Sequence, residues 1–234
     1  MVSTTREADA RLEVLRLPTG SADARCPHLI FRNVLGTDYV QALLKYVFDR
    51  QADFQIGDMH NRLTGERFVD PKMRIASYLH DLGAFGDPIR ALVDAVTVPA
   101  LKALNLIEPA VEPKEFLITA YPDGGYIGEH IDTQTGPRRV RILSCVYYFA
   151  ATPHRFSGGE LRLYGFPQRS APGTEPSRPP FVELAPETDS LIFFPSWLRH
   201  EVLPVRVPSG AWADSRFTIN CWIHRAEVPS AKAS

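Results

Sequence analysis

Residues 115–132 read EFLITAYPDGGYIGEHID, and this stretch decides what kind of fold the chain adopts. Its first half, residues 116–121, is rich in β-branched and aromatic side chains, as is typical of a strand. Pro122-Asp123-Gly124-Gly125 then has the composition of a turn. A strand-like stretch that carries His130 and Asp132 follows the turn.

The same texture of short strand-like runs separated by turns continues towards the end of the chain. Many short strands at turn-marked intervals are typical of a sandwich or jelly roll, and not of a parallel sheet. We therefore predict a mainly β fold of the α+β class. The further strands that we expect lie over residues 141–150, 160–164, 181–184, 190–194, 202–207 and 216–224.

The chain before residue 115 has a different pattern. A strand is predicted at residues 29–31, and apolar residues at helical spacing predict a helix over residues 39–48 with an N-cap at residues 36–38. Asp87-Pro88 predicts the start of a second helix, which we expect Pro99 to kink or divide. The organisation we expect is a loose N-terminal tail over residues 1–25, a helical support region over 26–110 and a β domain over 111–226, the last two forming one globular unit.

Charge and cysteine content exclude several classes of protein. The 26 basic and 27 acidic residues give a formal net charge of −1, so no electrostatic attraction to nucleic acid or to an anionic membrane is expected. The N-terminal residues lack an apolar segment of the kind found in secretion signals, and no run approaches the ~20 apolar residues of a membrane span. Three cysteines, Cys26, Cys145 and Cys221, make no disulfide framework, and we expect a soluble cytoplasmic protein with buried thiols.

His130 and Asp132 are the residues of the opening stretch that point to chemistry. Alternate residues of an extended strand point to the same side, so both side chains can face one metal ion. His200, 68 residues after Asp132, can supply a third ligand. Two imidazoles and one carboxylate occupy one face of an octahedral iron(II) and leave the opposite face open for a co-substrate and dioxygen. The other histidines, His28, His60, His80, His154 and His224, are interpreted as ordinary core or surface residues.

Arg216 is a candidate for binding an acidic co-substrate. A 2-oxoacid that chelates iron through its keto and C1-carboxylate oxygens leaves its far carboxylate in need of a buried cation. Arginine offers a planar fork that matches such a carboxylate. Thr218 adds a hydroxyl donor nearby. Tyr121 and Tyr148 are candidates for further phenolic donors, with two core tyrosines as the alternative interpretation.

As an ordered set, these motifs resemble a known family, the 2-oxoglutarate- and Fe(II)-dependent dioxygenases, in their prolyl 4-hydroxylase-like branch. The resemblance covers residues 115–224, nearly half of the chain. Each motif is weak alone, and their order makes the set specific. The matching pieces are YPDGGYxxxHxD over residues 121–132, CVYYF over 145–149, SGGEL over 157–161, HEVxPV over 200–205 and RFxxxxW over 216–222.

The resemblance implies a double-stranded β-helix, a distorted jelly roll, backed by N-terminal helices, with the dioxygenase domain over residues 111–226. It implies that Arg216 pairs with the distal carboxylate of 2-oxoglutarate, with Tyr148 and Tyr121 in the same pocket. The implied iron ligands are His130, Asp132 and His200. The implied cofactors are Fe(II), 2-oxoglutarate as co-substrate, and ascorbate.

One departure from the family pattern concerns the basic residue. In the family this residue usually follows the second histidine more closely than Arg216 does here, because residues 208–214 look like an inserted turn. Arg206 is therefore the rival for the carboxylate, although the match at Trp222 favours Arg216.

The activity implied is hydroxylation of an aliphatic carbon of a peptidyl residue, an amino acid or a small metabolite, with 2-oxoglutarate converted to succinate and CO2. The alternatives are a non-catalytic jelly-roll module that binds a small molecule and a cupin-like or hydrolytic zinc enzyme. A peptide and a small molecule are both compatible as substrates, and the oligomeric state is left open. The breaker-rich residues 166–180 and the Arg138-Arg139 turn are candidates for a lid, with a solvated loop as the alternative.

Overall fold

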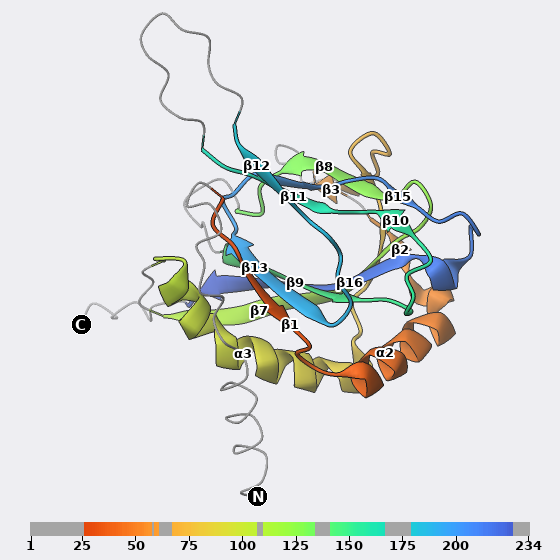
Figure 1. The fold of residues 1–234 in the computed structure, drawn as a ribbon, viewed down its shortest axis with the longest axis horizontal. Coiled ribbons are helices and arrows are strands. Elements are labelled where there is room, and N and C mark those ends of the chain that lie inside the picture. Colours follow the sequence, from red (N-terminus) through yellow and green to blue (C-terminus); the bar gives the residue numbers. More distant parts are fainter. Residues whose placement is uncertain are drawn as a thin grey trace, which may run out of the picture.

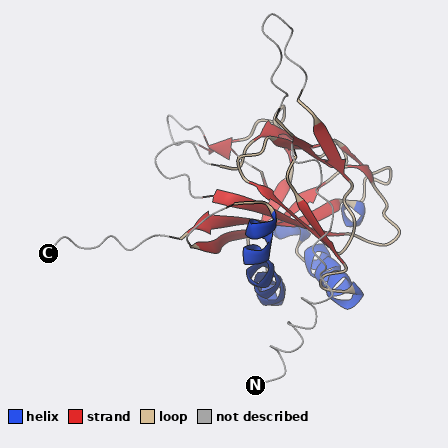
Figure 2. Ribbon diagram, turned by 60° about the vertical axis from the view of Figure 1, so that its left-hand side comes forward, coloured by secondary structure: helices blue, strands red, loops and turns tan. Residues whose placement is uncertain are grey.

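Two antiparallel β-sheets face each other in the computed structural model, and two helices cover the outer face of the larger sheet (Figures 1 and 2). The expected tail, the Arg138-Arg139 turn and most of the breaker-rich segment lie outside the residues that the structure describes. Neither helix in the described part of the chain has the length and apolar content needed to cross a bilayer. The described residues are 26–57, 59–60, 67–106, 110–133, 141–166 and 179–226.

The larger sheet has seven strands in the order β1-β13-β9-β16-β7-β6-β2. Its centre is β16, which pairs antiparallel with β7 on one side and with β9 on the other. The bounds are β1 Leu29–Arg32, β2 Gln55–Ile56, β6 Ser77–Leu79, β7 Val111–Tyr121, β9 Arg141–Phe149, β13 Ser190–Pro195 and β16 Arg216–Arg225.

The smaller sheet has five strands in the order β12-β11-β14-β8-β5 and lies opposite the larger one (Figure 1). Its bounds are β5 Arg74–Ile75, β8 Tyr126–His130, β11 Leu161–Tyr164, β12 Phe181–Leu184 and β14 His200–Val202. Two short antiparallel pairs join β3 Met59–His60 to β4 Arg67–Phe68, and β10 Ser157–Gly158 to β15 Val205–Arg206. Single 3-10 turns lie at Gln51–Asp53, Gly83–Phe85 and Trp212–Asp214.

The helices α2 (Thr37–Asp49) and α3 (Gly86–Ala103) bury one apolar face each against the larger sheet. Burying such a face is the main source of a helix's stability in a protein of this size. Alternation along β16 sends one set of side chains to these helices and the other set into the space between the sheets. The set that packs beneath the helices is Phe217, Ile219, Cys221 and Ile223.

Three details differ from the expectations. Of the two outcomes expected at Pro99, a kink or a division, the division does not occur: α3 runs through Pro99, because a proline removes one backbone hydrogen bond while Val96, Ala100 and Leu101 stay packed in the core. The strand expected over residues 202–207 is two strands, β14 and β15, which pair with different partners on either side of Pro204. The short strands β2, β5 and β6 were not expected, because two or three residues show no measurable period.

The N-cap of α2 is Gly36, within the expected residues 36–38, but the side chain that binds the backbone there comes from another part of the chain. No side chain caps the helix locally. Instead, the buried carboxylate of Asp189 accepts hydrogen bonds of 2.9 Å from the backbone N–H groups of Leu35 and Gly36. The hydroxyl of Tyr147 donates to the same carboxylate at 2.9 Å. This long-range contact fixes the chain just before the helix, and the N–H of Gly36 is one of the helix-start donors that lack an intrahelical partner.

Candidate functional site

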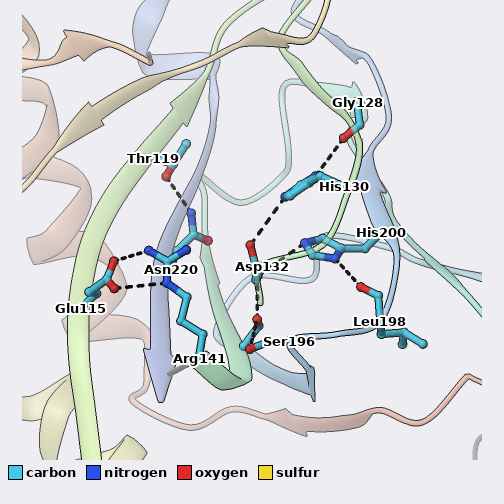
Figure 3. A network of polar contacts seen from close by, with 11 residues as sticks. Glu115, Thr119, Gly128, His130, Asp132, Arg141, Ser196, Leu198, His200 and Asn220 are labelled. Carbon is cyan, nitrogen blue, oxygen red and sulfur yellow. Dashed lines mark hydrogen bonds and ion pairs between the residues drawn. The ribbon is translucent and has the colours of Figure 1, made fainter. Parts of the chain in front are cut away.

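Three residues expected to share a metal ion converge between the two sheets (Figure 3). His130 ends β8 and His200 begins β14, and the two lie directly opposite each other in the paired strands, with ring centres 4.2 Å apart. The Asp132 carboxylate lies 3.6 Å from Nε2 of His130 and 3.5 Å from Nε2 of His200. One ligand atom of each residue lies within 4.8 Å of the other two. Among the described residues this is the one His, Cys, Asp or Glu group that meets this spacing.

Backbone carbonyls fix the orientation of both imidazoles. Nδ1 of His130 lies 2.8 Å from the carbonyl oxygen of Gly128. Nδ1 of His200 lies at the same distance from the carbonyl oxygen of Leu198. Because a carbonyl only accepts, each Nδ1 donates its proton and each Nε2 presents its lone pair to the shared space.

Two serines hold the carboxylate. The hydroxyl of Ser144, on β9, donates to Oδ2 of Asp132 at 2.6 Å and lies 2.9 Å from the hydroxyl of Ser196. The backbone N–H of Asp132 donates to the carbonyl of Ser196 at 2.9 Å. These contacts attach the loop that carries Asp132 to the larger sheet.

The electrostatics of the three residues suit a divalent metal. Burial lowers the pKa of His200 to about 4, so its imidazole is neutral at neutral pH. Burial by itself would raise the pKa of Asp132, but His200, His130 and the Ser144 hydroxyl together bring that pKa below its usual range. The carboxylate is therefore ionised, and two imidazoles with one carboxylate make the donor set of a non-haem iron(II) site.

A buried cation lies further along the same space. Arg216 is only 1% exposed. Its guanidinium carbon lies 4.5 Å from the ring centre of Tyr121 and 5.0 Å from that of Tyr148. Nε and Nη1 of Arg216 and the hydroxyls of Tyr148 and Thr218 are buried without a hydrogen-bond partner in the described part of the chain. Buried donors without acceptors are costly, so the arrangement fits an anionic ligand with several acceptor oxygens.

The two phenols beside Arg216 remain protonated. Burial raises the pKa of Tyr148 to about 12, and burial also raises the pKa of Tyr121 above its usual value. Both rings therefore keep their hydroxyl proton at neutral pH, and the Tyr148 hydroxyl can donate it to a ligand.

Gly159 makes room for the buried arginine. Its φ is +72°, and a Cβ built on it would lie 2.6 Å from Cδ of Arg216 and 2.9 Å from Cγ2 of Val205. Gly159, the second glycine of the SGGEL motif, is thus required both by its left-handed backbone and by its close approach to the Arg216 side chain.

Replacing Gly159 by alanine is expected to lower the free energy of unfolding by roughly 2–4 kcal/mol, from backbone strain plus a clash that displaces Arg216. Urea denaturation measures this change. Gly210→Ala is the matched control, because Gly210 has a φ of +63° and no atom within 4 Å of the added Cβ. An equal loss in both variants would show that contact with Arg216 contributes nothing.

The metal-ligand group and the buried arginine share one cavity of about 440 Å³, with open solvent at its mouth included. The rival Arg206 is exposed on β15 and does not line this cavity. The structure therefore brings Arg216, and not Arg206, to the residues singled out in the sequence. The cavity is lined by Tyr121, Ile127, His130, Asp132, Ser144, Cys145, Val146, Tyr148, Leu161, Phe194, His200, Val202, Arg216, Asn220 and Trp222.

Sequence reasoning missed three polar residues of the site, namely Ser144, Ser196 and Asn220. A signal for two of them exists in the alternation of each strand. Ser144 is four residues before Tyr148 on β9, and Asn220 is four residues after Arg216 on β16, so each shares the inward face of its strand.

Comparison with known proteins identifies the domain. Residues 116–224 match the model of the 2OG-Fe(II) oxygenase superfamily. These residues form a 2OG-Fe(II) oxygenase domain. A stretch of 125 residues is 41% identical to an uncharacterised PKHD-type hydroxylase of Synechocystis sp.. That stretch is 53% of this chain and 41% of the other protein, so the chain spans about two fifths of the length of the curated relative it matches.

Solved structures share the fold of the oxygenase domain and its helices. A prolyl hydroxylase from Trichoplax adhaerens, in complex with a peptide fragment of a hypoxia inducible factor, superposes with a TM-score of 0.62 at 18% identity, covering 96% of this chain and 94% of that one. A prolyl-4-hydroxylase of Pseudomonas putida gives a TM-score of 0.58 at 21% identity, covering 85% and 92%. The expected double-stranded β-helix, with its likeness to prolyl hydroxylases, is confirmed.

The oxygenase family implies Fe(II) and 2-oxoglutarate, and the residues present fit both. Three donors of the right kind converge within bonding reach of one ion. The unpaired donors of Arg216, Tyr148 and Thr218 match the oxygens of a carboxylate.

Proposed function

We propose that this chain is a 2-oxoglutarate- and Fe(II)-dependent hydroxylase that acts on an aliphatic carbon of a peptidyl residue, an amino acid or a small metabolite. One observation carries the proposal. A single cavity holds a metal-ligand group at one end and, at the other, a buried cation with unpaired donors around it. A ligand with one chelating end and one carboxylate end, such as 2-oxoglutarate, is complementary to both.

In this proposal His130, Asp132 and His200 hold the iron, which supplies the activation of dioxygen when bound. The protein's part is to fix the donors. The Gly128 and Leu198 carbonyls keep Nε2 of each imidazole available, and Ser144 keeps the carboxylate in place.

Arg216 binds the distal carboxylate of 2-oxoglutarate in the same proposal. Its free Nε and Nη1 form one side of a fork, and the hydroxyls of Tyr148 and Thr218 add two donors. The Tyr121 ring lies against the guanidinium and holds its plane. Four donors that have no partner among the described residues would thereby gain acceptors.

The walls between the two ends of the cavity are largely apolar and keep water from the reacting carbon. Leu161 and Val202 come from the smaller sheet, and Phe194 and Val146 come from the larger one. Exclusion of water strengthens the interactions of charged groups inside the cavity and limits side reactions. The overall reaction consumes substrate, 2-oxoglutarate and dioxygen, and yields hydroxylated substrate, succinate and CO2.

Ascorbate as a further cofactor and a cytoplasmic location belong to the same proposal. The free state of all three cysteines supports a reducing compartment.

Succinate formation tests the proposal. The full chain is incubated with Fe(II), 2-oxoglutarate and ascorbate in air, across a panel of amino acids and proline-containing peptides. We expect succinate in step with a hydroxylated product, and a fall to background without Fe(II) or without 2-oxoglutarate. Saturable binding of panel compounds with no succinate under any condition would instead favour the non-catalytic jelly-roll module.

A further inference from the structure

One polar side chain inside the cavity has no part in the function described so far. Asn220 lies on β16 between Thr218 and Trp222, and alternation along the strand places all three on the inward face. It lines the same cavity as the metal ligands and is the one side-chain amide among the lining residues.

Thr119 fixes the amide of Asn220. Nδ2 of Asn220 donates to the Thr119 hydroxyl at 2.7 Å, from β16 to the neighbouring β7 (Figure 3). Thr119 has no exposed surface. One amide hydrogen of Asn220 remains, because this bond to Thr119 is the only side-chain hydrogen bond that Asn220 makes to the described residues. The partly buried amide is therefore held in one orientation with a donor to spare.

The register of β9 and β16 places this donor between the two ends of the cavity. Thr218 is opposite Tyr148, Asn220 is opposite Val146, and Trp222 is opposite Ser144. The first of these rows belongs to the carboxylate-binding end, and the last contacts the metal-ligand group because Ser144 donates to Asp132. The row of Asn220 lies between them.

The dimensions match a five-carbon diacid. Successive rows on one face of a sheet are about 7 Å apart. The end carbons of 2-oxoglutarate are about 5 Å apart, from ordinary bond lengths. The Arg216 guanidinium reaches the row of Thr218 and Tyr148, where its carbon lies 5.0 Å from the Tyr148 ring centre. A molecule with its distal carboxylate at that row therefore brings its keto-acid end to the next row, that of Asn220. Val146 and Leu117, the residues opposite Asn220 on the two neighbouring strands, have no polar side-chain group.

We propose that Asn220 is a further 2-oxoglutarate-binding residue, whose free amide hydrogen donates to an oxygen of the keto-acid end. Thr119 is a positioning residue that sets the orientation of the amide. This inference rests on the proposed function and deepens it, because it assigns a polar contact to the end of the co-substrate that Arg216 does not reach.

Calorimetric titration of the Mn(II)-loaded full chain with 2-oxoglutarate tests the inference without turnover. Asn220→Ala is expected to weaken binding on the order of tenfold, as for loss of a hydrogen bond to a charged group. Asn220→Asp is expected to weaken binding further, because it sets a second carboxylate against the ligand. Thr119→Val should also weaken 2-oxoglutarate binding, because it removes the hydroxyl that holds the amide. Thr119→Ser keeps a hydroxyl and should bind 2-oxoglutarate as wild type does.

Unfolding temperatures without ligand show that each variant is folded. If the wild type binds 2-oxoglutarate and a folded Asn220→Ala variant binds it with the same affinity, this inference is overturned and the proposed function stands. Absence of saturable 2-oxoglutarate binding by the Mn(II)-loaded wild type would overturn both.

Discussion

Replacing Arg216 by methionine is expected to weaken 2-oxoglutarate binding at least ~100-fold, because it removes the charged fork from a cavity where little else is cationic. The folded state without ligand is expected to lose little or no stability. In wild type Nε and Nη1 of the buried guanidinium have no partner among the described residues, and a methionine of similar length removes the cost of leaving them so. Calorimetric titration measures the affinity, and thermal unfolding without ligand measures the stability.

Arg206→Met is the matched control, since Arg206 is an exposed arginine ten residues earlier in the chain. It is expected to bind 2-oxoglutarate as wild type does. If Arg216→Met bound normally and Arg206→Met did not, the carboxylate would belong to Arg206. If Arg216→Met failed to fold, Arg216 would be a structural residue.

Replacing Asp132 by alanine is expected to abolish 2-oxoglutarate turnover, because the metal loses its one anionic ligand and with it the open-faced geometry that the reaction needs. A residual rate below about 1% of wild type is expected from the scale of such losses. Succinate formation at saturating Fe(II) measures this, and iron content after desalting shows whether the metal is retained.

Glu129→Ala is the control for Asp132→Ala. Glu129 is a carboxylate three residues earlier, but it is partly exposed and pairs with Arg199 at 2.6 Å on the outer side of the smaller sheet. Pairs of this kind contribute little to stability, so the variant should keep its iron and its turnover. Comparable losses in both variants would mean that carboxylate charge in general, and not coordination by Asp132, sustains the activity.

The strands were largely predictable because their apolar residues alternate over four or more positions. The runs that became β9, β12 and β16 were each located within a residue or two. The short strands form by pairing: β6 pairs with β7, β2 pairs with β6, and β5 pairs with β8. Two or three residues carry no sequence pattern that predicts such a partner. The cap that Asp189 provides for α2 has the same origin, since it joins residues more than 150 positions apart.

The candidate site, like the fold, was only partly predictable from the sequence. The metal-ligand group and Arg216 could be proposed because several short motifs stand in a fixed order along the chain. Ser144 and Asn220 were missed, because a polar residue in a strand is equally compatible with a solvent-facing position. Their even spacing from Tyr148 and Arg216 is the available signal, and the register of β9 with β16 confirms that both share the inward face. Burial, likewise visible only in the folded chain, separates Arg216 from Arg206.

The most direct test asks whether His130, Asp132 and His200 together bind one iron(II) ion. The full chain is titrated with Fe(II) anaerobically at neutral pH, and bound metal is counted after removal of free ion. We predict one equivalent of iron per chain in wild type and none retained by His130→Ala or His200→Ala. Failure of the folded wild type to retain iron, or retention of a full equivalent by both histidine variants, would contradict it.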